Sequence, residues 1–380
     1  MATLEPLYVV LVHFNPQGYK RRDELFAACV KHMLSFSEVR LVTEVVLFPE
    51  QDICTGVIPT CVSSSHSRWV HNVVHCVGIE DSLWFKENLV NLGVEAVERQ
   101  GGRFVAWVDA DITFTNLNWA TDTVRALQTY CFVQPWTFAE LLGPDGYAVH
   151  RTVKSFGSQF ASGKAYAARG NDDLEYWHPG FAWAARVDSL RSAGGLLEET
   201  LGSADNHLAC ALIGAAGDTV PPTISGAYKS AVLAHEAALK GMALGAVQGT
   251  IRHSWHGSLE SRRYVGRWDI LAVHQFEPHW LARGESGLLE WTGLATPDLR
   301  KDIVNYFMQR NEDSVEVKDV DISVKKTGTL NGHSAPNTKH AFYFAQREKE
   351  TVLPCLACHV LDYLAIPLFD LLSCLDSLVL

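Results

Sequence analysis

An apolar strand that ends in two carboxylates constrains this chain more than any other stretch. Residues 104–108 read Phe-Val-Ala-Trp-Val, and Asp109 and Asp111 follow directly. An unbroken apolar run of this length is typical of a strand covered on both faces, as in the parallel sheets of α/β proteins. Ligands bind at the carboxyl ends of such strands, so both acids are expected at a ligand site.

Two carboxylates one residue apart repel each other unless a cation lies between or beside them. Asp109 and Asp111 therefore suggest a divalent ion that carries phosphates, and their hard oxygen ligands suit Mg²⁺ or Mn²⁺. The alternative is that the pair caps a helix predicted to begin near Asn118, where Asp is common. An isolated Asp-x-Asp favours the cap, whereas the sequence around this one favours the metal.

Composition and charge exclude several classes of protein. The chain has 380 residues, of which 47% are hydrophobic, so it can bury a large core. Its net charge of −11 argues against nucleic acid as the main ligand. The nine cysteines are scattered and odd in number, which favours reduced core thiols over a disulfide framework. With neither a signal peptide nor a transmembrane run in the sequence, a cytoplasmic location is expected.

Strand patterns alternate with helix patterns along the first half of the chain, which predicts a mostly parallel sheet. The polar, Gly-rich residues 143–173 are predicted as a long mobile loop that closes over a ligand. Residues 258–313 mix charged and apolar side chains and are predicted to be helical. The predicted strands are 8–12, 39–48, 72–77, 104–108 and 131–134, and the predicted helices are 23–36, 83–98, 119–129 and 227–244, with one more opened by Asp205.

The last sixty residues differ in character from the rest. A polar linker at 331–338 precedes an apolar tail. Cys355-Leu-Ala-Cys-His359 matches the attachment pattern for c-type haem, but one Cys-x-x-Cys supplies only two thiolates, and haem attachment needs an export route. The tail is therefore expected to pack on the main domain or to serve in oligomerisation.

Further motifs stand in a fixed order around the acidic strand end. They are Phe14-Asn15-Pro16, Lys86-Glu-Asn88, Trp107-Val-Asp-Ala-Asp111, His178-Pro-Gly-Phe-Ala-Trp-Ala-Ala-Arg186, Gly202-Ser-Ala-Asp205 and His253-Ser-Trp-His256-Gly257. In this order they resemble glycosyltransferases of the GT-A fold, as in family 2 and the polypeptide N-acetylgalactosaminyltransferases. The resemblance is greatest to glycosyltransferase-like proteins of phages and large DNA viruses, and it covers residues 6–315.

The resemblance implies an α/β, Rossmann-like fold of the GT-A type, with a mostly parallel mixed sheet flanked by helices and a helical C-terminal extension. It places a nucleotide-sugar-binding and catalytic domain at 1–257 and a helical extension packed on it at 258–320, and it leaves 321–380 as a linker and tail. The implied activity is metal-dependent transfer of a sugar from a nucleotide sugar, a UDP-sugar, to a hydroxyl acceptor. That acceptor belongs to a glycan, a protein or a modified nucleobase.

The resemblance also implies a ligand set for Mn²⁺ or Mg²⁺. Asp111 is expected to bind the ion directly, and Asp109 to contact it through water or to contact the ribose. A late His completes the metal shell in this fold, and His253 is the expected ligand, with His256 as the alternate. The alternative for either His is a hydrogen bond within the loop.

Three residues are implied on the donor side, and two of them have a structural alternative. Asn15 follows the first strand, Glu44 lies on the second, where the family places an acid that recognises the nucleotide, and Lys86 could pair with donor phosphates. Glu44 could instead be an edge-strand charge and Lys86 a surface residue of its helix. Arg262, Arg263 and Arg267 could bind diphosphate, although a solvated helix face is the default for such charges.

On the acceptor side the resemblance implies His178 and Trp183, with support of the fold as the alternative for His178. Asp205 would be the base that deprotonates the acceptor hydroxyl, which favours an inverting over a retaining mechanism. Its structural alternative is a helix N-cap.

Two other functions stay open from the sequence. One is a catalytically inactive nucleotide-sugar-binding protein of the same fold. The other is a metal-dependent nucleotidyltransferase, which predicts a Gly-rich phosphate loop with a Lys near the amino terminus, and the sequence has none there.

Overall fold

The structure is a computed structural model that describes residues 5–48, 67–164, 166, 175–258, 261–262 and 266–316. The chain divides after Val320, so all described residues belong to its first part. The predicted tail, with Cys355 and His359, lies outside the described residues. Among the helices that are described, none has both the length and the apolar character needed to cross a membrane.

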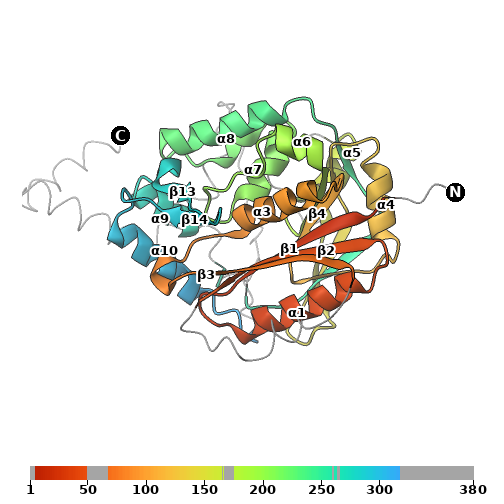
Figure 1. Cartoon of the computed structure of the whole chain (residues 1–380), viewed down its shortest axis with the longest axis horizontal. Helices are drawn as coiled ribbons and strands as arrows, with labels where there is room; N and C mark the ends of the chain where they lie inside the picture. The colour runs from red at the N-terminus through yellow and green to blue at the C-terminus, as the bar shows by residue number, and fades with distance from the viewer. Residues whose placement is uncertain are drawn as a thin grey trace, which may run out of the picture. The chain divides into compact units, whose positions relative to one another are not determined.

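A seven-stranded sheet forms the centre of the fold, in the order β11-β6-β10-β4-β1-β2-β3 (Figure 1). Every neighbouring pair is parallel except those of β10, which runs antiparallel to both β4 and β6. The predicted mostly parallel, mixed sheet is therefore confirmed. Its strands are β1 Leu7–Phe14, β2 Val39–Leu47, β3 Trp69–Cys76, β4 Phe104–Val108, β6 Phe132–Gln134, β10 Ala182–Arg186 and β11 Leu244–Ala246.

Helices cover both faces of this sheet, because successive residues of a strand point to opposite faces. Val9 and Leu11 pack with α1 in one core, whereas Val10 packs with α3 in the other. Figure 1 shows α1 on one side of the sheet and α3, α7 and α8 on the other. These helices are α1 Lys20–Leu34, α3 Lys86–Arg99, α4 Trp119–Ala126, α6 Val187–Ser192, α7 Ala204–Ala211 and α8 Gly226–Leu239, with short 3-10 turns η1 Ile79–Asp81 and η2 Ala216–Thr219.

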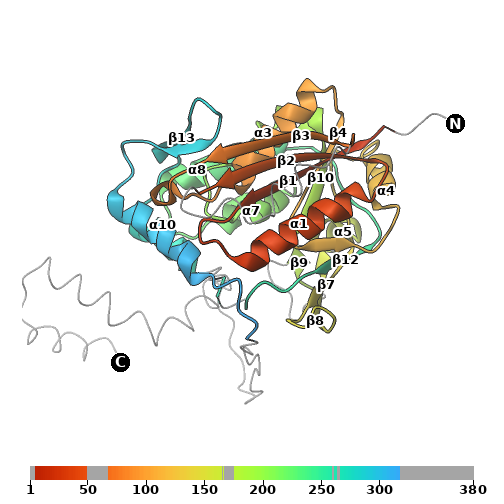
Figure 2. The same ribbon diagram turned by 60° about the horizontal axis from the view of Figure 1, so that its bottom comes forward.

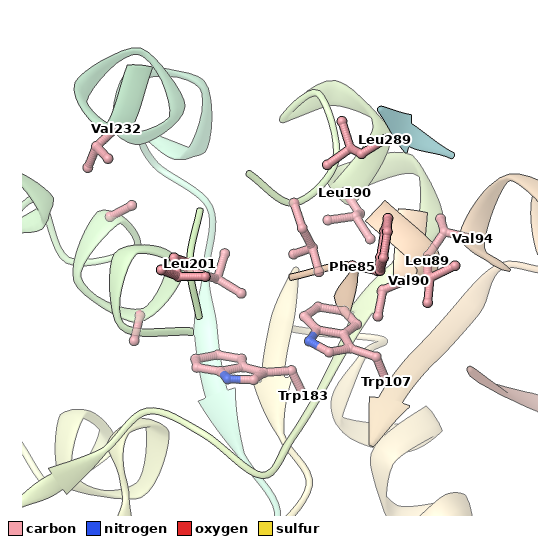
Figure 3. Packing of buried hydrophobic residues seen from close by; sticks show 14 of the residues in the cluster. Phe85, Leu89, Val90, Val94, Trp107, Trp183, Leu190, Leu201, Val232 and Leu289 are labelled. Carbon is pink, nitrogen blue, oxygen red and sulfur yellow. The ribbon is translucent and has the colours of Figure 1, made fainter. Parts of the chain in front are cut away.

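Helix α3 packs closely on the sheet and thereby sets where its first residue, Lys86, lies. A Cβ at Gly93 would lie only 2.6 Å from Cγ1 of Val10, so the helix approaches β1 at a distance that only glycine permits. Figure 3 shows Phe85 and the α3 residues Leu89 and Val90 next to Trp107, which is paired with Trp183 across β4 and β10. Burial of these large rings fixes the start of α3 next to the end of β4.

A second sheet lies next to the end of β4, in the order β5-β12-β7-β8-β9. It contains β5 Ile112–Phe114, β7 Phe138–Leu142, β8 Val149–Ser155, β9 Trp177–His178 and β12 Thr250–His253. Figure 2 shows β7, β8, β9 and β12 close together. The prediction of a loop at 143–173 is wrong for β8 and for the helix α5 Phe156–Ala161 that follows it. Strand β8 has few apolar residues and is held by its pairing with β7, which the sequence pattern does not reveal. Residues 165 and 167–174 lie outside the described part.

The C-terminal extension contains α9 Gly266–Val273, a 3-10 turn η3 Pro278–Trp280, β13 Leu281–Arg283, β14 Leu289–Trp291 and α10 Pro297–Gln309. The prediction of helix throughout this region is wrong for the hairpin of β13 and β14. Its connection carries Gly284 and Gly287, and Gly287 has a φ of 82°, a turn conformation that favours glycine. Arg283 anchors the hairpin by ion pairs with Glu95 and with Glu198.

Candidate functional site

The two acids of the Asp-x-Asp motif lie in the short connection between β4 and β5. The backbone N–H of Asp109 donates to the carbonyl of Phe181 at 2.8 Å, and the carbonyl of Asp111 accepts from Ser254 at 2.8 Å. The N-cap of α4 is Asn118, so neither acid caps that helix and the capping alternative is wrong. The motif is held by β10 on one side and by the turn after β12 on the other.

Asp111, His253 and His256 come together as a group that could hold a metal ion. Oδ2 of Asp111 lies 2.7 Å from Nε2 of His256 and 3.4 Å from Nε2 of His253. One ligand atom from each of the three residues lies within 4.8 Å of the others, and both imidazoles are buried. The structure thus brings together the expected ligand Asp111, the preferred His253 and the alternate His256.

The strand register explains why these residues meet. Strand β12 runs antiparallel to β5 with His253 opposite Ile112, which follows Asp111 in the chain. Three residues later His256 lies at the same carboxylate, because the Ser254 N–H bonds to the Asp111 carbonyl and holds the segment after β12 beside it. Neighbouring strands from distant parts of the sequence therefore deliver both imidazoles to one carboxylate.

The electrostatics of this group suit a cation. Burial alone would raise the pKa of Asp111, but His253 and His256 outweigh it and hold that pKa well below its usual range. Burial lowers the pKa of His253, and Asp111 only partly offsets this, so the neutral, metal-binding imidazole is favoured there. Oδ1 of Asp111 is buried and has no hydrogen-bond partner among the described residues, so it has a lone pair to offer an ion.

Asp109 belongs to a second cluster, centred on Lys86. Nζ of Lys86 lies 2.7 Å from Oδ1 of Asp109 and 3.0 Å from Oδ2 of Asp205. Burial raises the pKa of Asp109 to about 6, with Lys86 opposing the rise and Asp205 and Asp111 adding to it. The Asp109 side chain keeps 27% of its exposure, so solvent can reach this carboxylate. Lys86 is thus no free surface cation, and here it pairs with two carboxylates.

Asp205 and His178 flank Gly180 beside this cluster. The N-cap of α7 is Ser203, so Asp205 lies within the first turn and its predicted capping alternative is wrong. A Cβ at Gly180 would lie 3.2 Å from Cε1 of His178 and 3.7 Å from Oδ2 of Asp205, which places both groups around one backbone position.

His178 is a neutral imidazole in this site. Its ring stacks on Phe181 at 4.1 Å, and burial, reinforced by nearby cationic groups, lowers its pKa to about 3. Its Nδ1 accepts a hydrogen bond from the Gly180 N–H at 3.2 Å, so the ring proton is on Nε2. His178 can therefore donate one hydrogen bond but does not carry charge.

Three predicted site residues are engaged elsewhere. Trp183 is only 1% exposed and its Nε1 donates to the Pro179 carbonyl, so it lies in the core and not on a surface that an acceptor could reach. The side chain of Asn15 bonds to Tyr19 and Asp23 and fixes the turn into α1. Glu44 is buried between His71 at 2.8 Å and His75 at 3.1 Å.

Two residues contact the ligand His256, and the sequence did not predict either contact. Arg262, buried near the start of the extension, has Nη2 2.9 Å from Nε2 of His256. Glu312, which follows α10, has Oε2 3.3 Å from Nδ1 of His256. No local motif marks Glu312, because its position depends on how the extension folds back.

No protein-family model matches this chain, and no curated protein matches it. Solved structures are similar to it at low identity. They include the catalytic domain of Drosophila beta1,4galactosyltransferase 7 in complex with xylobiose, at 13% identity over 56% of this chain, with a TM-score of 0.29. Another is glucosyl-3-phosphoglycerate synthase from Mycobacterium tuberculosis in complex with Mn²⁺, UDP and phosphoglyceric acid, at 12% identity over 71% of this chain and 76% of that one, with a TM-score of 0.34.

A third similar structure is mannose-1-phosphate geranyltransferase from Thermus thermophilus, at 14% identity over 65% of this chain and 75% of that one, with a TM-score of 0.30. The chain spans 62% of the length of the Drosophila structure, which is less than two thirds. Likenesses at this level assign no function to this chain.

Proposed function

We propose that this protein is a metal-dependent glycosyltransferase that transfers a sugar from a UDP-sugar to a hydroxyl acceptor. The observation that carries the proposal is the group of Asp111, His253 and His256 at the carboxyl end of β4. This edge of a parallel sheet is where ligands bind in open α/β folds. The cluster of Lys86, Asp109 and Asp205 lies beside it and supplies further groups for binding and proton transfer.

The donor atoms of the metal group support Mn²⁺ or Mg²⁺. One carboxylate and two imidazoles leave coordination positions for phosphate oxygens, and such a mixed set suits Mn²⁺ in particular. The unpartnered Oδ1 of Asp111 fits the same role. A bound ion would neutralise the charge that develops on the departing diphosphate.

Asp109 and Lys86 are proposed to face the donor. Asp109 is part-exposed and lies two residues before the metal ligand Asp111, a position from which it can contact the ribose or a metal-bound water. Lys86 is held at the start of α3, where an ammonium can exchange one carboxylate partner for a phosphate oxygen.

Asp205 is proposed as the base that accepts the acceptor's proton in an inverting reaction. Its carboxylate is held beside Gly180 by the ion pair with Lys86. The neutral His178, on the other side of Gly180, can donate a hydrogen bond to the acceptor or to the sugar. A retaining enzyme would not need Asp205 in this role.

A panel of nucleotide sugars, assayed for hydrolysis with and without Mn²⁺, tests the proposal. We expect release of UDP and free sugar that requires Mn²⁺ and that Asp111→Asn abolishes. The matched control is Asp122→Asn, a part-exposed acid of α4 outside the site, which should keep the parent rate. Binding of UDP-sugar without turnover would favour an inactive binding protein. Release of pyrophosphate from UTP and a sugar phosphate would favour a nucleotidyltransferase.

A further inference from the structure

The residues that follow α10 fold back onto the candidate metal site. This segment, Arg310 to Ser314, is called the strap below. Its Ser314 carbonyl accepts a hydrogen bond from Nε1 of Trp255 at 2.8 Å. A Cβ at Gly257 would lie 2.8 Å from the carbonyl oxygen of Asn311, so the strap lies directly against the turn that carries His256. The strap therefore packs on the part of the metal site that the sequence places in another domain.

Glu312 is the strap residue that reaches a metal ligand. Its side chain is 1% exposed, and Oε2 lies 3.3 Å from Nδ1 of His256. The same carboxylate is paired with Nη1 of Arg22 at 2.9 Å and with Nε of Arg310 at 2.5 Å. Two guanidinium groups keep this buried carboxylate ionised and occupy its other lone pairs, so it is not itself a candidate ligand.

The two nitrogens of His256 face different groups. Nδ1 faces Glu312, and Nε2 faces Oδ2 of Asp111 at 2.7 Å. Arg262 can only donate hydrogen bonds, and its Nη2 lies 2.9 Å from Nε2, so Nε2 is the acceptor and the ring proton is on Nδ1. Nδ1 has no hydrogen bond of good geometry among the described residues, and the Glu312 carboxylate at 3.3 Å is the acceptor that faces it. The lone pair of the neutral ring is then on Nε2, which is the atom in the candidate metal group.

We propose that Glu312 is a positioning residue of the metal site, which fixes the proton of His256 on Nδ1 and so presents Nε2 to the ion. This inference rests on the proposed function. A carboxylate behind a metal-binding imidazole orients the ring and makes it a stronger ligand. Glu312 acts through His256, and the metal site is incomplete without the strap, which extends it well beyond the 1–257 domain.

A neighbouring residue of the strap provides a matched control. Asp313 accepts hydrogen bonds from the backbone N–H groups of Lys20 and Arg21 at 3.2 Å and 2.8 Å, at the start of α1. It holds the strap in place through the backbone of α1 and not through His256. Asn keeps one acceptor oxygen for the Arg21 N–H, so Asp313→Asn should keep the strap attached and leave the proton position on the ring unchanged.

The test measures binding of Mn²⁺ alone to the full chain, from the electron paramagnetic resonance of the free ion. We expect Glu312→Gln to weaken binding by about 10-fold to 100-fold, as loss of an outer carboxylate does in other metal sites. Asp313→Asn should leave the affinity unchanged. In a His256→Ala background, Glu312→Gln should cause no further loss, because its effect passes through that ring. A further loss there would overturn the proposal.

A spectroscopic readout covers the case in which Glu312→Gln does not fold. In the wild-type chain loaded with Zn²⁺, nitrogen-15 spectra of the imidazoles should show His256 protonated on Nδ1 and metal-bound through Nε2. The reverse assignment would overturn the proposal. If the wild type binds Mn²⁺ and Asp111→Asn does not, but Glu312→Gln binds like the wild type, only the role of Glu312 is refuted. If the wild type binds no Mn²⁺, the metal site fails and this inference with it.

Discussion

Lys86→Met should destabilise the protein in a way that depends on pH. The substitution keeps the length of the side chain but removes the cation that pairs with Asp109 at 2.7 Å and with Asp205 at 3.0 Å. Removing one partner of a fully buried ion pair costs about 3–5 kcal/mol. Asp109 and Asp205 keep 27% and 28% of their exposure and remain partly solvated, so the expected loss near pH 8 is smaller, about 1–3 kcal/mol.

The sign of the pH dependence follows from Asp109. Burial already raises its folded-state pKa to about 6, above the ordinary value of 3.8, and Lys86 opposes that rise. Without Lys86 the folded-state pKa rises further. A carboxyl whose folded-state pKa is raised contributes full stability below its unfolded pKa, and this is lost as the pH rises through the folded value. The difference in stability between variant and wild type should therefore be small near pH 5 and larger at pH 8.

Urea unfolding of the wild type and Lys86→Met at pH 5 and pH 8 measures this difference. The matched control is Lys20→Met, since Lys20 is 85% exposed and lies 3.6 Å from Glu24. Such a surface pair contributes about 0–1 kcal/mol, so the control should differ little from the wild type at either pH. An equal loss at both pH values in Lys86→Met, or no loss at pH 8, would refute the arrangement of this cluster.

Three further outcomes are expected. Burial raises the pKa of Glu87 to about 8 against the opposing effect of Lys86, and Oε2 of Glu87 has no hydrogen-bond partner among the described residues. The wild type should lose stability as the pH rises from 4.5 through 8, and Glu87→Gln should be the more stable protein at pH 8, by about 1–4 kcal/mol in urea unfolding. Gly93→Ala should lower the free energy of unfolding by about 1–3 kcal/mol, because its Cβ would meet Val10 at 2.6 Å; a stabilised variant would show that the α3 contact is looser than described. Asp205→Asn should keep UDP binding but lower the rate of sugar transfer by about 100-fold or more; a near-parent rate would favour a retaining mechanism.

The central strands were predictable because each is a short apolar run. The predicted bounds of β4, residues 104–108, agree with the structure, and β1 and β2 differ by one or two residues at their ends. A strand that is buried on both faces has a continuous apolar sequence, whichever strands it pairs with. Strand β8 and the hairpin of β13 and β14 lack it, because their pairing with other strands holds them in place and local composition does not.

The metal group was partly predictable. Asp111 and the segment that holds His253 and His256 follow from the sequence, but the choice between the two imidazoles does not. In the structure both rings lie at Asp111, because β12 pairs with β5 and places the segment that holds them beside this carboxylate. Lys86 between Asp109 and Asp205, and Glu312 behind His256, depend on tertiary packing across 119 and 56 residues of sequence, where no periodicity applies.

Calorimetric titration of UDP in the presence of Mn²⁺ tests the central claim most directly. The wild type should bind UDP with Mn²⁺ and bind it far more weakly after chelation of the ion. Asp111→Asn removes a ligand charge at the metal group, so it should abolish the Mn²⁺-dependent binding while Asp122→Asn retains it. Thermal unfolding should show that both variants remain folded. Folded Asp111→Asn that binds UDP with the wild-type affinity in Mn²⁺ would contradict the claim that this carboxylate holds the metal for a nucleotide-sugar donor.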